Sequence, residues 1–438
     1  MKLVSYGVLL IVCVAVQSSY AAQDTAPMPE IVTGDIQEQI EKHIAEKVEE
    51  GEGYFHLRFE GKDLTLNLVR VHVEYLASLS PTRHFACVDM VGADGEFYDV
   101  DFFMEGTRND MRVTETTVHK INGQSIYVWK QAEDKTWERV PVADASADLL
   151  GVINDRDHFE FRYETTLPAI NTEAKVWIPL ATSDAFQTIK IKSINGPSPY
   201  QILKDRTEGN VILYFECGPD ASGKSIVITY DVERREKNAY EDDPSNAQRY
   251  LNVPDDVNDI ALVKATADEL VKGKETDLMR ARALYDYTID VLAYKKAGEG
   301  WGAADVAYAC DARSGNCTDY HAYFIALARA AGIPARFAIG ASIPSNRDEG
   351  GVDGYHCWAE FYADGKWWPV DISEADKFTS LSMYYFGHHP ANRIELSRGQ
   401  NLRVRPGPLS GPINFLAYPV LEVDGVTVRP QKFFSFKR

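Results

Sequence analysis

The sequence predicts an α+β protein with a strand-rich N-terminal half and a C-terminal half that mixes helices with strands. Residues 54–145 and 158–235 contain short runs of β-branched and aromatic residues separated by turn residues, as expected of antiparallel sheets. Two amphipathic helices follow, at about 256–271 and 277–292. From residue 317 onward a helix, a strand and a hairpin succeed one another. This order predicts β-rich domains first and a mixed α+β domain after them.

The composition is that of a folded, acidic chain. Hydrophobic residues make up 45% of the 438 residues, and a chain of this length is expected to form two or three domains. The formal net charge is -19 and is spread along the sequence. Nucleic acids and anionic membranes attract clustered Lys and Arg, so neither is expected as a partner.

Residues 1–22 have the pattern of a signal peptide. Lys2 supplies a positive start, and the apolar run from Val4 to Val16 is too short to span a bilayer, which takes about 20 residues. Ala21 and Ala22 offer cleavage sites. We see no later transmembrane segment, so we expect an exported protein, periplasmic or extracellular.

Five cysteines follow the predicted cleavage site, so at least one thiol stays unpaired within the chain. One reactive cysteine at position 317 and four structural ones would fit this count. The other four, whose pairing the sequence leaves open, are Cys87, Cys217, Cys310 and Cys357.

A helical segment is predicted at residues 28–50. Asp35 and Glu38 match a capping box, and Gly51 follows as a stop. Apolar residues recur every four positions on one face, at Ile36, Ile40, Ile44 and Val48. We interpret the segment as a packing helix.

The domain predicted at residues 54–145 gives no clear chemistry. Asn122-Gly123 lies between two apolar runs and predicts a hairpin turn. Asp99 and Asp101 could be calcium ligands, but no oxygen-rich loop surrounds them, so we read them as one polar face of a strand.

A second β block, at residues 158–235, predicts a small β-sandwich, and residues 238–255 have the composition of a linker. Its strands are expected at Thr165–Pro179, Phe186–Ile194, Val211–Cys217 and Ser225–Val232.

Cys317 is the candidate nucleophile. Asn316 is a favourable helix N-cap with Asp319 three positions later, so Cys317 is expected in the first turn of a helix. The partial positive charge of that turn stabilises a thiolate and lowers its pKa. The backbone N–H of Cys317 could donate to an oxyanion on an attacked carbonyl.

A general base and its orienting acid are predicted on a hairpin. The strands His356–Phe361 and Trp367–Ile372 flank the turn Ala363-Asp364-Gly365-Lys366. Counting back from the turn places His356 and Asp371 roughly opposite each other, close enough for the carboxylate to hold the imidazole.

A zinc site is the alternative interpretation of Cys310, Cys317, His321, His356 and Cys357. Their spacings lack the paired C-x₂₋₄-C pattern, so no metal and no cofactor is expected. His321 is expected to flank the site on the helix. Cys357 should point away from the face used by His356, as a buried thiol or in a disulfide with Cys310.

Three separated motifs resemble the core of bacterial transglutaminase-like proteins. They are Gly315-Asn316-Cys317-Thr318-Asp319-Tyr320-His321 with Ala328-Arg329-Ala330-Ala331-Gly332-Ile333-Pro334-Ala335-Arg336, then Tyr355-His356-Cys357-Trp358-Ala359-Glu360-Phe361-Tyr362, then Trp368-Pro369-Val370-Asp371. The resemblance implies a papain-like catalytic domain at about 256–390. It implies the triad Cys317, His356 and Asp371. Residues 391–438 are predicted to form a β-rich extension.

The resemblance also implies an oxyanion helper upstream of the cysteine. Tyr294 and Trp301 are the candidates, and either could instead be a core residue. The implied activity is cleavage or transfer of acyl groups at amide bonds of peptide or protein substrates, through a thioester. A non-catalytic binding or structural protein that retains the fold is the alternative. The sequence predicts neither the substrate nor the oligomeric state.

Overall fold

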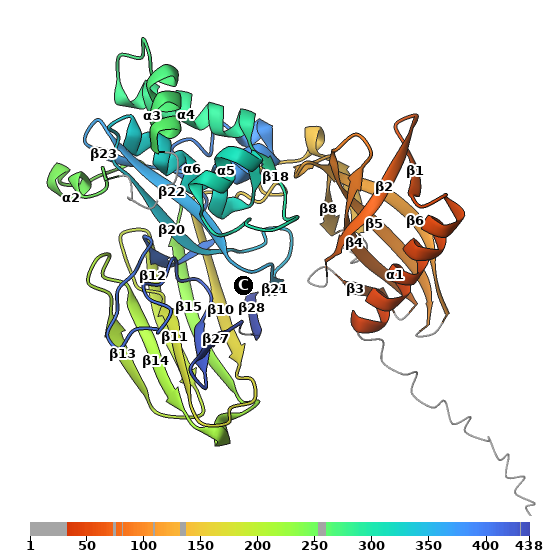
Figure 1. The fold of residues 1–438 in the computed structure, drawn as a ribbon, viewed down its shortest axis with the longest axis horizontal. Helices are drawn as coiled ribbons and strands as arrows, with labels where there is room; N and C mark the ends of the chain where they lie inside the picture. Colours follow the sequence, from red (N-terminus) through yellow and green to blue (C-terminus); the bar gives the residue numbers. More distant parts are fainter. Residues whose placement is uncertain are drawn as a thin grey trace, which may run out of the picture.

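The computed structural model describes residues 33–72, 76–80, 82–107, 110–131, 137–252, 260–429 and 431–438. The predicted signal peptide, the start of the helix predicted at 28–50 and the start of the helix predicted at 256–271 lie outside these residues. Figure 1 shows a helix-covered N-terminal sheet on one side, and a β-sandwich and a mixed α+β region on the other. The predicted α+β class, with β-rich N-terminal sheets, is confirmed.

The N-terminal region is a seven-stranded antiparallel sheet packed against helix α1 (Thr33–Glu50). Ile36, Ile40 and Ile44 are each 1% exposed or less and pack on the sheet, as their four-residue spacing predicts. The strand order is β1-β2-β4-β5-β6-β7, with β3 beside β4. The bounds are β1 (Phe55–Phe59), β2 (Lys62–Val71), β3 (Ala77–Ser80), β4 (Arg83–Gly92), β5 (Phe97–Thr107), β6 (Asp110–Ile121) and β7 (Gln124–Ser125).

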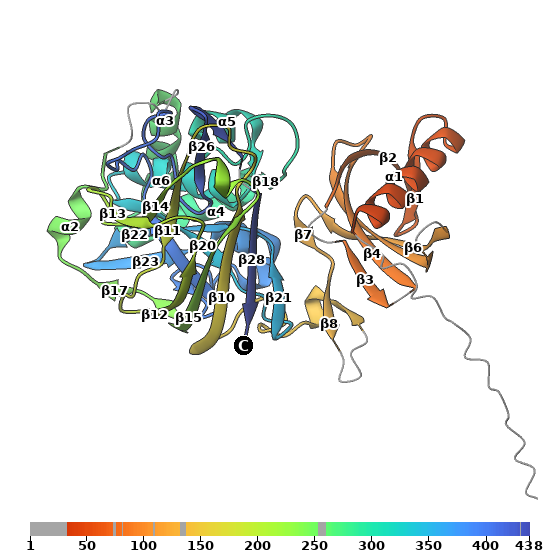
Figure 2. The same ribbon diagram turned by 90° about the horizontal axis from the view of Figure 1, so that it is seen from below.

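The two faces of this sheet differ in chemistry. Val88, Val100 and Phe102 point to the apolar core beneath α1. Cys87 and Asp101 alternate with them and therefore lie on the other face. Figure 2 shows α1 on the side of the sheet that is turned away from the rest of the molecule. The polar face thus looks toward the C-terminal half.

The hairpin predicted at Asn122-Gly123 is confirmed. Both residues have positive φ, 50° and 86°, as a two-residue hairpin turn requires. A further hairpin follows, formed by β8 (Tyr127–Gln131) and β9 (Trp137–Pro141).

Two five-stranded sheets form the β-sandwich. Its apolar core lies between them. The first sheet contains β12 (Gln187–Asn195), β15 (Ser225–Arg235), β10 (Arg156–Thr166), β28 (Gln431–Lys437) and β21 (Glu349–Val352). The second contains β13 (Tyr200–Lys204), β14 (Val211–Cys217), β11 (Ala174–Leu180), β26 (Val420–Val423) and β27 (Val426–Val428).

The single strand predicted at Thr165–Pro179 is wrong. The chain instead leaves β10 after Thr166 and enters β11 at Ala174. Pro168 lies in the connection and has no N–H to donate to a ladder. The Asp424 carboxylate accepts hydrogen bonds from the backbone N–H groups of Asn171 and Thr172, which holds this turn.

The mixed region places helix α6 (Cys317–Ala330) against the sheet β17-β23-β22-β20-β25. Residues 317 to 328 are all buried, so this helix is the centre of the core. The strands are β17 (Tyr240–Glu241), β23 (Lys366–Val370), β22 (His356–Ala363), β20 (Ala335–Ser342) and β25 (Arg393–Arg398). The other helices are α3 (Ile260–Leu270), α4 (Asp277–Val291), α5 (Val306–Ala312) and α7 (Ile372–Lys377).

The segment predicted as a linker and the predicted C-terminal extension both pair with the sheets. The linker region contributes β17 and the short helix α2 (Pro244–Gln248). Of the extension, β25 joins the mixed sheet, whereas β26, β27 and β28 join the sandwich. Among the described helices, none combines the length and apolar character needed to cross a bilayer.

A glycine fixes the close approach of three strands beside the site. Gly340 in β20 pairs with His356 on one side and with Glu395 on the other, and an added Cβ would overlap the backbone carbonyl of Ile394. We expect Gly340→Ala to cost about 1–3 kcal/mol of unfolding free energy, because backbone cannot move aside as a side chain can. Urea unfolding measures this. Gly351→Ala is the control, since its Cβ would meet only ordinary contacts at 3.7 Å, and equal midpoints for the two variants would contradict the argument.

Candidate active site

Cys317 begins α6, as predicted. The Asn316 side chain accepts a hydrogen bond from the Thr318 N–H at 2.9 Å, and Asp319 accepts one from the Asn316 N–H at 2.9 Å, which completes a capping box. Asp319 also accepts from the Gly302 N–H at 2.7 Å and so fixes the preceding loop. The thiol therefore lies in the first turn, where free N–H groups favour an anion.

The structure brings His356 and Asp371 together. His356 begins β22, and its Nε2 lies 2.6 Å from Asp371 Oδ2. The ladder pairs Ala359 with Val370, so His356 and Asp371 are diagonal rather than directly opposite. Asp371 follows the end of β23 and caps α7 by accepting from the Glu374 N–H. Because Nε2 faces the carboxylate, Nδ1 is the nitrogen left for the thiol.

The charges in this group support one another. Hydrogen bonding from Cys357, and then from His356, holds the pKa of the Cys317 thiol well below its usual range despite burial. Burial opposes the charged imidazole, yet Asp371 and the thiolate raise the pKa of His356 to about 10. Burial likewise opposes the Asp371 carboxylate, yet His356 holds its pKa well below the usual range. A thiolate–imidazolium pair beside a carboxylate is therefore the favoured state.

His321 links the first turn of α6 to the first turn of α7. Its Nδ1 lies 2.6 Å from the Cys317 carbonyl oxygen, and its Nε2 accepts from the Ile372 N–H at 3.0 Å. Only the neutral tautomer with the proton on Nδ1 satisfies both contacts. Burial also lowers the pKa of His321. This side chain thus ties the first turn of α6 to that of α7, a link that the sequence interpretation of a flanking histidine did not include.

Cys357 contacts the candidate nucleophile. Strand alternation places Cys357 with Ala359 and Phe361 on the face of β22 that packs on α6. Cys317, at the start of α6, lies opposite this face, and hydrogen bonding from Cys357 lowers the pKa of its thiol. Cys357 is fully buried, and Thr318 Oγ1 lies 3.3 Å from its sulfur. All five described cysteines are free thiols, so Cys357 is not in a disulfide with Cys310.

The two predicted oxyanion helpers differ. Tyr294 is in β18 (Ala293–Tyr294), which pairs with β19 (Ser314–Gly315) just before Cys317. Burial, and then the charge of Cys317, raises the pKa of the Tyr294 hydroxyl well above its usual range, so this side chain lies near the thiol. Trp301 is half-buried, and among the described residues no hydrogen bond joins it to Cys317.

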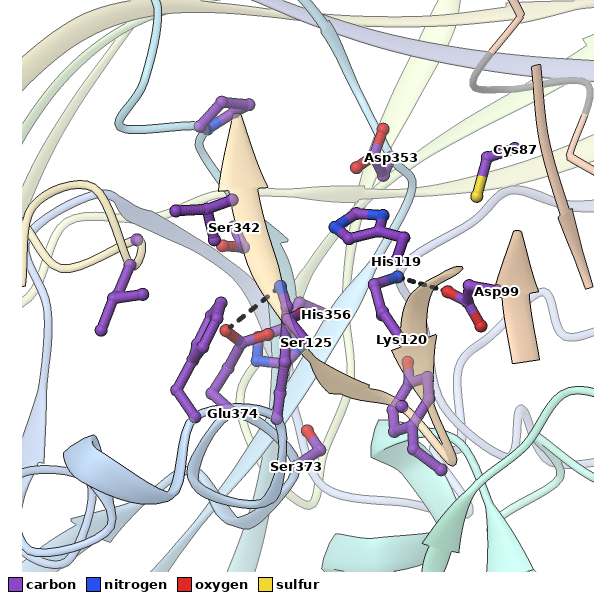
Figure 3. A pocket seen from close by; sticks show the side chains of 18 of the residues that line it. Cys87, Asp99, His119, Lys120, Ser125, Ser342, Asp353, His356, Ser373 and Glu374 are labelled. Carbon is purple, nitrogen blue, oxygen red and sulfur yellow. Dashed lines mark hydrogen bonds and ion pairs between the residues drawn. The ribbon is translucent and has the colours of Figure 1, made fainter. Parts of the chain in front are cut away.

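A cavity of about 410 Å³ adjoins the site. His356, Tyr355 and Glu374 line it from the mixed region. The opposite wall is the polar face of the N-terminal sheet, including Cys87 and His119 (Figure 3). Cys317 is 3% exposed and is not among the residues that line the cavity. Sequence patterns could not reveal this cavity, because its two walls come from segments that are far apart in the sequence.

Comparisons with known proteins agree with this architecture. The profile of the transglutaminase-like superfamily matches residues 264–372. An uncharacterized protein of Haemophilus influenzae is 26% identical over 337 residues, which cover 65% of this chain and 90% of that protein.

Two solved structures are also similar. A candidate cysteine protease from Cytophaga hutchinsonii is 15% identical with a TM-score of 0.45, over 64% of this chain and 91% of that one. The periplasmic domain of TgpA from Pseudomonas aeruginosa, bound to ethylmercury, is 22% identical with a TM-score of 0.30, over 53% and 94%. By the match to the family profile, the chain carries, at residues 264–372, a domain of the transglutaminase-like superfamily.

Proposed function

We propose that this protein is an exported cysteine enzyme that acts on amide bonds of peptides or proteins through a thioester intermediate. The observation that supports this most is the buried contact of 2.6 Å between His356 and Asp371, beside a thiol in the first turn of α6. The export proposal rests on the signal pattern of residues 1–22.

In the proposed reaction, the Cys317 thiolate attacks the amide carbonyl and forms a tetrahedral oxyanion. The backbone N–H of Cys317 donates to this oxyanion. His356 gives its Nδ1 proton to the departing amine, which leaves a thioester on Cys317. Water or a second amine, deprotonated by His356, then attacks the thioester and restores the thiolate.

The cavity suggests the route of the substrate. His356 lines it, and its two walls come from the mixed region and the N-terminal sheet. We propose that an extended peptide segment enters between them and reaches Cys317 past Tyr294, which also lines the cavity.

The test is a peptide substrate screen that compares the mature chain with Cys317→Ala. Mass spectrometry of a glutamine peptide, with and without a primary amine, separates the two outcomes of the thioester. Ammonia release without amine incorporation identifies a hydrolase, and amine incorporation identifies an acyltransferase. Cys217→Ser serves as the matched control, because Cys217 is also a buried free thiol but lies in the sandwich.

A non-catalytic binding protein is the second candidate. The low exposure of Cys317 favours a closed site. Absence of turnover with every peptide, together with unchanged peptide binding by Cys317→Ala, would support this candidate over the enzyme.

The pH dependence of kcat/KM should be broad. The thiolate form of Cys317 persists at pH values below the ordinary cysteine pKa and is lost as the pH falls through its lowered pKa. The acid form of His356 persists until the pH rises through about 10. Rates measured across this range should therefore show a plateau that spans neutrality. A bell centred on the ordinary histidine pKa of about 6.5 would contradict the assignment.

A further inference from the structure

The polar face of the N-terminal sheet gathers three different metal-ligating side chains. Cys87 in β4, Asp101 in β5 and His119 in β6 each offer one ligand atom, and these atoms all lie within 4.8 Å of one another. In the sheet, β5 lies between β4 and β6. None of these residues belongs to the Cys317 site.

The strand register explains why they meet. Cys87 lies directly opposite Asp101 in the β4–β5 ladder. Between β5 and β6 the ladder pairs Val100 with Val118 and then Asp99 with Lys120, which leaves His119 as an extra residue in a bulge. A bulge redirects a side chain, so His119 reaches the same face as Cys87 and Asp101.

Aromatic side chains hold two of the three groups in place. The Tyr127 hydroxyl donates to Asp101 Oδ2 at 2.7 Å, and Trp129 Nε1 donates to the same oxygen at 3.3 Å. The Tyr127 ring stacks on His119 with centroids 4.7 Å apart. Outer partners of this kind orient the ligands of a metal ion.

The inner atoms of the cluster are left without good partners. Asp101 is fully buried, and within the described part of the chain neither its Oδ1 nor His119 Nδ1 has a hydrogen-bond partner. The two atoms form a loose ion pair with each other at 3.5 Å, without hydrogen-bond geometry. Buried polar atoms are rarely left in this way, because the loss of water is not compensated. Nearby charges are already paired, Lys120 with Asp99 and His72 with Asp89, each at 2.6 Å.

We propose that Cys87, Asp101 and His119 bind a divalent transition-metal ion of the Zn²⁺ class. Sulfur and imidazole ligands exclude Ca²⁺ and Mg²⁺, which take oxygen, and match Zn²⁺. One thiolate and one carboxylate balance the charge of the ion, and the thiol proton passes to solvent when the ion binds. Cys87 and His119 line the same cavity as His356 (Figure 3), so a fourth coordination position faces that cavity and is open to water or a substrate oxygen.

Cobalt titration of the mature chain tests this site. All arms carry Cys317→Ala, so that the catalytic thiol cannot bind the ion. We expect one Co²⁺ per chain, with a sulfur-to-cobalt charge-transfer band in the near ultraviolet that Zn²⁺ displaces. Cys87→Ser should remove the band, and His119→Gln should weaken binding by more than about 100-fold, since changes outside the ligand shell alone cost 10–100-fold. Cys217→Ser, a buried cysteine elsewhere, should leave band and affinity unchanged.

Two results would overturn the proposal. One is sub-stoichiometric Co²⁺ binding without a charge-transfer band, which means that the cluster is only a polar network. The other is a band that survives in folded Cys87→Ser. If Cys87→Ser does not fold, zinc X-ray absorption of the Cys317→Ala protein decides the matter, because the proposed site gives one sulfur ligand with nitrogen and oxygen, whereas any other set contradicts it.

Discussion

Asp371→Asn should lower kcat/KM by about 10²–10⁴-fold, the range that a positioned proton-transfer group contributes. The Asp371 carboxylate lies 2.6 Å from His356 Nε2 and stabilises the imidazolium in a fully buried site. The amide retains the shape of the side chain but removes its charge. The pKa of His356 should therefore fall, and the alkaline limit of the rate profile should fall with it.

The matched control for this change is Asp376→Asn. Asp376 is a buried carboxylate in α7 that accepts from the Tyr320 hydroxyl at 2.8 Å, and in the described part of the chain no hydrogen bond or ion pair joins it to His356. We compare the two variants by measuring kcat/KM in steady state with the substrate that the peptide screen identifies. Equal rates for the two variants would remove Asp371 from the proposed reaction.

Glu360→Gln should destabilise the mixed region by about 3–5 kcal/mol, because it leaves a buried cation without its principal partner. Glu360 and Lys237 are fully buried and form an ion pair, and Arg336 pairs with Glu360 at 2.7 Å. After the substitution, Glu395 at 3.7 Å is the anionic partner that remains for Lys237 among the described residues, beside the rings of Phe186 and Tyr240. The midpoint of urea unfolding measures the change.

An exposed pair provides the control for this prediction. Glu173 forms an ion pair with Lys175 at 3.2 Å near the surface of the sandwich. Glu173→Gln should change the unfolding free energy by no more than about 1 kcal/mol. A similar small effect for Glu360→Gln would show that the buried cluster contributes little to stability.

Local signals made the core of the site predictable. Asn316 and Asp319 specify where α6 begins, and the turn at Ala363 to Lys366 specifies the hairpin that carries His356 and Asp371. These features depend on residues that are close in sequence. The same is true of α1 and of the Asn122-Gly123 turn.

Contacts between distant segments could not be predicted in the same way. His321 bonds to Ile372, 51 residues away, and nothing in its own neighbourhood indicates that partner. β28 completes the sandwich by pairing with β10, although the whole mixed region lies between them in sequence. The contact of Cys357 with Cys317 follows from how α6 crosses β22, which strand alternation alone does not determine.

The protonation state of the Cys317 sulfur is the central property of the proposed catalytic triad. The ultraviolet absorbance of thiolate, measured against pH for the mature chain and for Cys317→Ala, gives the titration of this one group even though it is buried. If His356 stabilises the thiolate, the difference signal is already complete at neutral pH and shifts to higher pH in His356→Asn. A transition near the ordinary cysteine pKa of about 8.5, unchanged by His356→Asn, would contradict this role of His356.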